Sequence, residues 1–144
     1  MANKNDREIL AAALERHVME EDEILQEYRK LSDKLTESPL RVLVDHIVTE
    51  EEMHHFLLRT LGDWLQTPPS QGESLESQGL DREAILRDTR ALKEHEKKTV
   101  TECRELAAGL SGEEMVLFET VLEAIALDSE KHHRLLAAVE KLIG

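Results

Sequence analysis

Apolar residues recur at steps of three and four along four long segments of this sequence, the spacing that lines one face of an α-helix. The segments cover residues 6–35, 39–65, 81–108 and 111–143. The predicted inner stripes include Leu14, Ile24 and Leu31 in the first, Val44 in the second, Ile85, Thr89 and Cys103 in the third, and Ile125 in the fourth. Asp81 can cap the third segment, and Ser111 with Glu114 three residues later matches a capping box at the start of the fourth. Ser38 and Pro39 predict a tight turn between the first two. The pattern therefore predicts an all-α chain of four helices.

Residues 66–80 interrupt this pattern for longer than a tight turn requires. They contain Thr-Pro-Pro-Ser-Gln-Gly and Glu-Ser-Gln-Gly, which are turn and linker sequences without helical spacing. Fully extended, they could span roughly 50 Å, which exceeds the roughly 40 Å length of the second predicted helix. We therefore expect a long crossover that joins two helical hairpins into one antiparallel four-helix bundle. The length of 144 residues suits a single domain over residues 1–144.

Charge and composition restrict the partners of the chain. The 31 acidic residues outnumber the 18 basic ones, and the net charge of −13 is unsuited to binding nucleic acid or an anionic membrane surface. No run approaches the roughly 20 apolar residues of a membrane span, and the first residues lack an apolar signal region. Cys103 is the single cysteine, which suits a reducing compartment. We therefore expect a cytoplasmic protein.

Five ionisable side chains interrupt the apolar stripes near the middle of the predicted helices. They are Glu21, Glu51, His54, Glu96 and His132. In an antiparallel pair, residues equally distant from the connecting turn lie at one level. Glu21 and Glu51 are each 15 residues from Thr36. Glu96 and Ser129 are 16 and 17 residues from Gly112. We therefore expect the interruptions of all four helices to lie together at the middle of the bundle.

Three carboxylates and two imidazoles at one level of an apolar core require a compensating positive charge. No lysine or arginine occupies an inner position of the four stripes, so a bound cation is the candidate. Carboxylate oxygens combined with neutral imidazoles suit iron or manganese, and zinc less distinctively. The competing interpretation is a hydrogen-bonded polar layer that fixes the helix register.

These helices, the crossover and the interrupting residues together resemble the ferritin-like carboxylate di-metal bundles, most closely their rubrerythrin-like branch. The resemblance implies that Glu21 and Glu96 are single ligands, that Glu51 and His54 form a Glu-x-x-His motif, and that His132 is the imidazole of a second such motif. It also implies oxidation of Fe(II) by oxygen or peroxide at a di-iron centre. Because the chain contains no Cys-x-x-Cys module, electrons would come from a separate partner.

The second motif departs from the family at Ser129, which stands where a glutamate is expected. A serine hydroxyl cannot bridge two metals as a carboxylate can, so three outcomes stay open. Glu51 could be the sole protein bridge, a shifted helix could use Glu130 and His133, or the site could hold one metal or none. Helical geometry of about 100° per residue points Glu130 away from the stripe, which disfavours the shifted helix.

Two other functional classes are compatible with the sequence. One is a non-catalytic or degenerate metal-binding bundle that acts as a structural protein, through its acidic exterior or in a homo-oligomer. The other is a hemerythrin-like oxygen-binding bundle, suggested by the i, i+4 pairs His17/Glu21 and His46/Glu50. That class needs more converging histidines, and His46 lies off the stripe. We interpret His17 as an outer or packing residue and as the first reserve ligand.

Overall fold

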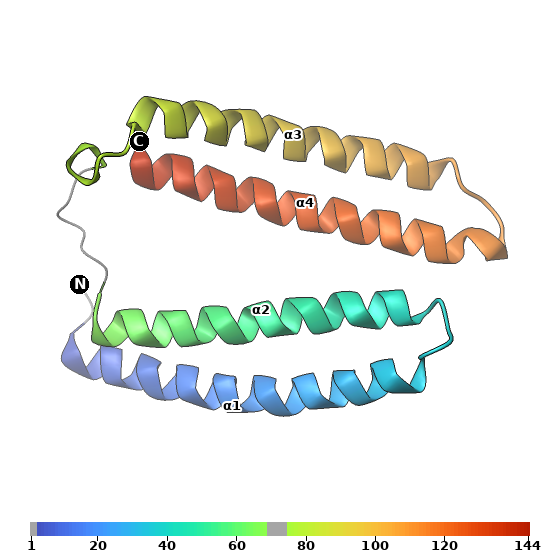
Figure 1. Cartoon of the computed structure of the whole chain (residues 1–144), viewed down its shortest axis with the longest axis horizontal. Helices are drawn as coiled ribbons and strands as arrows, with labels where there is room; N and C mark the ends of the chain where they lie inside the picture. The colour runs from blue at the N-terminus through green and yellow to red at the C-terminus, as the bar shows by residue number, and fades with distance from the viewer. Residues whose placement is uncertain (1–2, 69–74) are drawn as a thin grey trace. The chain divides into compact units, whose positions relative to one another are not determined.

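The computed structural model of the chain describes residues 3–68 and 75–144, which contain four α-helices and no β-strand (Figure 1). The α-helices are α1 (Lys4–Lys34), α2 (Arg41–Gln66), α3 (Arg82–Ala108) and α4 (Val116–Ile143). Two short 3-10 helices, η1 (Glu76–Gln78) and η2 (Glu113–Met115), precede α3 and α4. The predicted all-α class with four helices is therefore confirmed for the described part of the chain.

The chain divides into two compact units, residues 1–71 and residues 72–144. In the first unit α1 packs against α2, and in the second α3 packs against α4, with the two helices of each pair running in opposite directions (Figure 1). We call these pairs hairpin 1 and hairpin 2. The predicted single domain stays a prediction. Of the predicted crossover at 66–80, α2 takes Gln66 and η1 takes 76–78, while residues 69–74 lie outside the described part.

Two of the helices begin where local side chains satisfy free backbone N–H groups. The Asn3 side chain accepts a hydrogen bond from the Asp6 N–H at 2.8 Å, and Asp6 accepts one from the Asn3 N–H in return. Asp81 accepts from the Ala84 N–H at 3.1 Å, as predicted for the N-terminus of α3. These caps compensate for the missing intrahelical partners of the first turn. The Ser38 hydroxyl accepts from the Leu40 N–H at 3.2 Å before α2 begins, but α2 itself has no side-chain cap.

The predicted capping box of Ser111 and Glu114 is wrong. The chain enters α4 through η2, in which the Met115 N–H donates to the Gly112 carbonyl at 3.1 Å. Neither η2 nor α4 has a side-chain cap. Gly112 has φ +103°, a backbone conformation that favours glycine, and it redirects the chain before the 3-10 turn. The α-helix therefore begins at Val116, several residues later than the sequence pattern predicts.

Each helix buries the side that faces its partner in the same hairpin. Some predicted stripe positions are buried as expected, namely Leu14, Val44, Thr89 and Cys103. Elsewhere the buried residue follows the predicted one: Leu25 follows Ile24, Ser32 follows Leu31, Leu86 follows Ile85 and Ala126 follows Ile125. One residue corresponds to a rotation of about 100°. The predicted stripes are thus only partly buried within the hairpins, and Ile24 keeps 49% of its surface exposed.

Polar pairs along the sides of the hairpins fix which residues of neighbouring helices stand side by side. In hairpin 1 the buried Ser32 hydroxyl donates to Asp45 at 2.5 Å. In hairpin 2 Lys93 lies 2.7 Å from Glu140, and the Arg82 guanidinium donates to the last two backbone carbonyls of the chain. Ser32 lies near the end of α1 and Asp45 near the start of α2, whereas Arg82 begins α3 and contacts the end of α4. Helices that run in opposite directions require such pairings.

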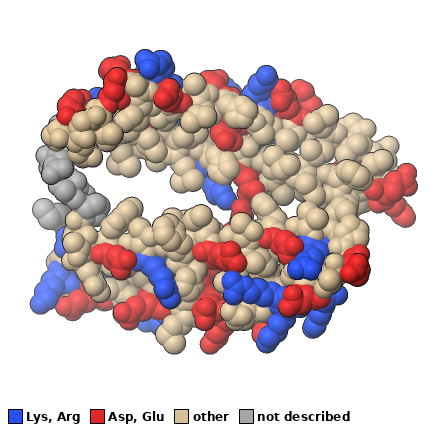
Figure 2. Space-filling view, viewed as in Figure 1, with Lys and Arg blue, Asp and Glu red and all other residues tan. Residues whose placement is uncertain are grey.

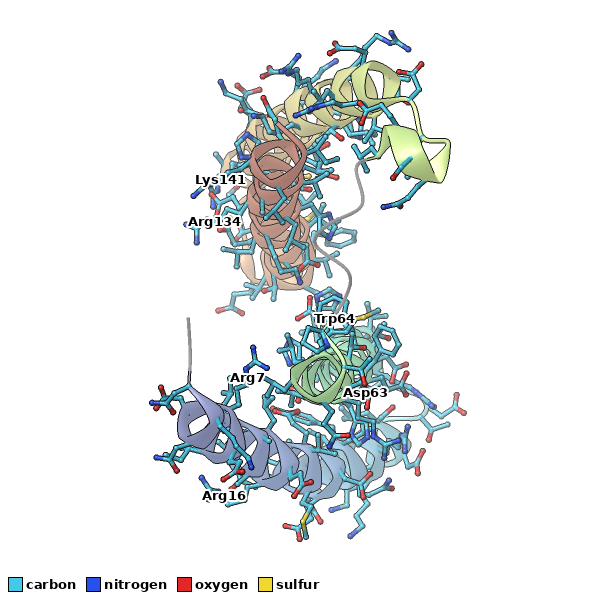
Figure 3. The ribbon with its side chains drawn as sticks, turned by 90° about the vertical axis from the view of Figure 1, so that its left-hand side faces the viewer. Arg7, Arg16, Asp63, Trp64, Arg134 and Lys141 are labelled. Carbon is cyan, nitrogen blue, oxygen red and sulfur yellow. The ribbon has the colours of Figure 1, made fainter. Side chains whose placement is uncertain are left out.

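Acidic and basic side chains are scattered over the visible surface of both hairpins, among larger areas of other residues (Figure 2). On α4, Arg134 and Lys141 are seven residues apart and project from the same side of the helix (Figure 3). Among the described residues, no helix has the combination of length and apolar character that crossing a membrane requires.

The Ser32–Asp45 contact predicts a measurable loss of stability on truncation. Because the Ser32 hydroxyl is buried, Ser32→Ala should lower the free energy of unfolding in urea by about 1 kcal/mol. Ser111→Ala is the matched control, since the Ser111 side chain caps no helix, and it should change stability by less than about 0.5 kcal/mol. An equal loss for both variants would contradict this assignment of the two serines.

Candidate metal centre

The middle of hairpin 1 brings together three of the predicted ligands. Glu51 and His54 lie one turn apart on α2, with 3.8 Å between Glu51 Oε1 and His54 Nδ1. Glu21 on α1 faces them, and one ligand atom from each of the three residues lies within 4.8 Å of the other two. Equal distance from the turn at Thr36 predicted that Glu21 and Glu51 would lie at one level, and this part of the prediction is confirmed.

The carboxyl groups of Glu21 and Glu51 are close enough to share a hydrogen bond when one of them is protonated. This contact is the largest cause of a raised pKa at Glu51. Partial burial and repulsion by the Glu21 charge raise the pKa further, whereas the nearby His54 lowers it. Two carboxylates this close cannot both be ionised without cost, so the pair holds a proton more tightly than an isolated glutamate does.

The Glu21 and Glu51 carboxyl groups also have oxygen atoms that could bind a cation. Without the shared proton, Glu21 Oε2 and Glu51 Oε2 are inaccessible to solvent and have no hydrogen-bond partner among the described residues. No lysine or arginine is paired with either carboxylate in the described part of hairpin 1. Two unsatisfied carboxylate oxygens beside an imidazole fit a divalent metal, which would replace the proton and satisfy both oxygens.

A pocket of about 340 Å³ opens beside this cluster on hairpin 1, and its lining residues are His17, Glu21, His54, Leu57 and Leu58. His17 lies one helical turn before Glu21, but its Nδ1 atom is 3.6 Å from Glu20. The pairing of His17 with Glu21, on which the hemerythrin-like comparison partly rests, is therefore not the contact that forms. The pocket adds a second histidine next to the three clustered ligands.

Hairpin 2 contains a reduced version of the same arrangement. Glu96 Oε1 lies 3.4 Å from His132 Nδ1, close to the separation of Glu51 and His54 in hairpin 1. The exposed fractions of the side chains also match, at 20% and 50% for Glu96 and His132 against 18% and 49% for Glu51 and His54. Ser129 is buried on the same helix as His132 and provides no carboxylate. Hairpin 2 therefore offers one carboxylate and one imidazole.

The shifted alternative that uses Glu130 and His133 has a competing contact. Glu130 Oε1 accepts a hydrogen bond from Arg104 at 2.6 Å, and the neighbouring Glu123 shares the same guanidinium. Glu130 and His133 line a different groove of hairpin 2, together with Lys93 and other residues that do not include Glu96 or His132. Glu130 therefore forms an ion pair with Arg104 on another side of α4.

One histidine was not expected to take part in the interior of hairpin 1. The Nδ1 atom of His55 is inaccessible to solvent and has no hydrogen-bond partner among the described residues. The sequence has two successive histidines at 54 and 55, but the apolar stripe predicts only His54 on the inner face.

That the clusters of the two hairpins meet at one level of a four-helix bundle stays a prediction.

Comparisons with protein families, curated proteins and solved structures identify no match to this chain.

The raised pKa of Glu51 predicts how stability responds to pH in the metal-free protein. A carboxyl group whose pKa is higher in the folded state stabilises the fold below pH 4.5, and this contribution is lost as pH rises through the folded-state pKa. Glu51→Gln removes the ionisation, so the chelator-treated variant should melt at a higher temperature than the unaltered protein at pH 7. The difference should vanish below pH 4.

Glu52→Gln is the neighbouring control for this experiment. Glu52 pairs with Arg29 at 3.0 Å on the exposed side of hairpin 1, so its loss should leave the melting temperature at pH 7 unchanged or slightly lower. A Glu51→Gln variant that melts below the unaltered protein at pH 7 would contradict the carboxyl contact with Glu21.

Proposed function

We propose that this chain is a ferritin-like metal-binding protein and that hairpin 1 binds iron through Glu21, Glu51 and His54. The observation that carries the proposal is the contact between two carboxyl groups beside an imidazole, with one ligand atom of each residue within 4.8 Å of the others. Two carboxyl groups this close repel each other when both are ionised, and a bound cation would compensate that repulsion.

The donor atoms favour a transition metal over calcium or magnesium, because His54 supplies an imidazole and the hard cations rarely use one. Iron and manganese suit two carboxylates with one imidazole, and zinc accepts the same donors. Iron is the metal we assign, because the predicted ferritin-like bundle would add Glu96 and His132 from hairpin 2. The di-iron bundles that the sequence resembles use four glutamates and two histidines, of which this chain would supply three glutamates and both histidines.

In this proposal the bound iron supplies the redox chemistry, which is oxidation of Fe(II) by oxygen or peroxide. The residues of the chain bind and orient the metal. Glu51 and Glu21 would neutralise the charge of the cation from the two helices, and His54 would orient it through a ring nitrogen. Electrons for repeated cycles would come from a separate donor, because Cys103 is buried and the chain has no second cysteine.

A non-catalytic metal-binding protein is the second candidate function. The observation that favours it is Ser129, which is buried in hairpin 2 where a carboxylate would complete the second cluster. With only Glu96 and His132 available, hairpin 2 binds a metal more weakly than hairpin 1. Exposed apolar side chains such as Phe56, Trp64 and Leu135 would then serve a homo-oligomer.

Anaerobic titration with Fe(II) tests metal binding at hairpin 1. Glu51→Ala should abolish binding of the tightest iron equivalent, because it removes a carboxylate and leaves Glu21 without its partner. Glu52→Ala should bind iron as the unaltered protein does, since Glu52 faces Arg29 instead. Equal iron content in the Glu51→Ala variant and the unaltered protein would exclude the site.

Exposure of the iron-loaded protein to oxygen separates the two candidate functions. The oxidase proposal expects a bridged-iron absorbance band and loss of Fe(II). Retention of Fe(II) with no absorbance band would instead support the non-catalytic protein.

Ser129→Glu tests whether hairpin 2 is a reduced copy of hairpin 1. The variant gives α4 a carboxylate one turn from His132 and opposite Glu96, the set that hairpin 1 already has. We expect it to raise the number of irons bound per chain and the rate of Fe(II) oxidation. The control Ser129→Gln has a similar shape without the charge and should raise neither. No gain with Ser129→Glu in a folded protein would show that α4 does not present residue 129 to the metal.

A further inference from the structure

The pocket beside the proposed site contains one potential ligand that the site itself does not use. Of its five lining residues, Glu21 and His54 belong to the cluster, while Leu57 and Leu58 have no metal-binding atom. His17 is the remaining one. It lies outside the group of ligand atoms within 4.8 Å of one another, so it is a neighbour of the site and not a member of it.

The orientation of His17 suits contact with a metal from solvent. Its side chain is 63% exposed, whereas the Glu51 side chain inside the cluster is 18% exposed. Nδ1 faces the Glu20 carboxylate at 3.6 Å, which leaves Nε2 available. A neutral imidazole nitrogen is a common ligand of divalent transition metals.

We propose that His17 is a capture ligand, which binds an incoming divalent metal at the pocket and passes it to Glu21, Glu51 and His54. This inference rests on the proposed metal site in hairpin 1. His17 precedes Glu21 by one turn on the same side of α1, and both line the same pocket, so a metal on His17 Nε2 can reach the Glu21 carboxylate by exchange of ligands. No redox step is involved, and His17 is released when the transfer is complete.

The experiment follows Co(II) binding to the full-length, chelator-treated protein by stopped-flow absorbance, because the visible bands of Co(II) report its ligands without oxidation. His17→Gln keeps the size of the side chain and removes the imidazole. We expect it to bind Co(II) about tenfold more slowly than the unaltered protein, with the same final spectrum and the same stoichiometry. His17→Glu retains a metal-binding group and should bind at close to the original rate.

His95→Gln is the matched control. His95 is an exposed histidine on α3 in the other hairpin, and its substitution should not change the rate. Equal rates for His17→Gln and the unaltered protein would overturn the inference. A changed final spectrum for His17→Gln would also overturn it, because His17 would then be a permanent ligand.

The Co(II) spectrum of a second variant shows whether the proposed metal site itself fails. If Glu51→Ala shows the same Co(II) spectrum as the unaltered protein, the metal does not bind at the hairpin 1 cluster and the proposed function fails. If the spectrum is lost in Glu51→Ala while the rate is unchanged in His17→Gln, only the role of His17 is excluded.

Discussion

The register of each helix against its single neighbour is the constraint on which the rest of this structure depends. A short connection after Lys34 returns the chain along α1, and η2 returns it along α3. Once the register is set, each buried position on one helix has a defined partner on the other. Ser32 meets Asp45, Glu96 meets His132, and Lys93 meets Glu140. The polar contacts in the middle of each hairpin are therefore consequences of where the turns lie.

That same register places two acidic groups against each other. Glu21 and Glu51 could each have been solvated on the outer side of its helix, as Glu52 is beside Arg29. They instead face each other at the level where an apolar pair would stabilise hairpin 1 better. Sites that reduce the stability of the bare protein commonly serve function.

Much of the helical architecture could be predicted because it depends on local signals. The spacing of apolar residues located four helices, Asp81 marked the start of α3, and equal distance from Thr36 paired Glu21 with Glu51. Other features depend on how each helix packs against its partner, and the spacing of apolar residues does not reveal this packing. The stripe pointed to Ile24, whereas the deeper residue is Leu25, because α2 covers the side of α1 that bears Leu14, Leu25 and Ser32.

The misassigned start of α4 has a related cause. Ser111 and Glu114 have the spacing of a capping box, but that pattern assumes an α-helix from its first turn. The conformation of Gly112 allowed a 3-10 turn instead, and a backbone choice of this kind is not encoded in residue spacing. The partner of Glu130 was equally hidden, since Arg104 lies 26 residues away in sequence and is reached only through the packing of α3 on α4.

The raised pKa of Glu51 beside Glu21 means that a proton and a metal ion compete for the same carboxyl pair in the proposed site. Metal binding there would release protons and would weaken as the solution becomes more acidic. The protein would then give up a bound metal most readily where protons are abundant. In this sense the acidic pair would set a direction of transfer, from neutral surroundings into the protein and from the protein into acidic ones.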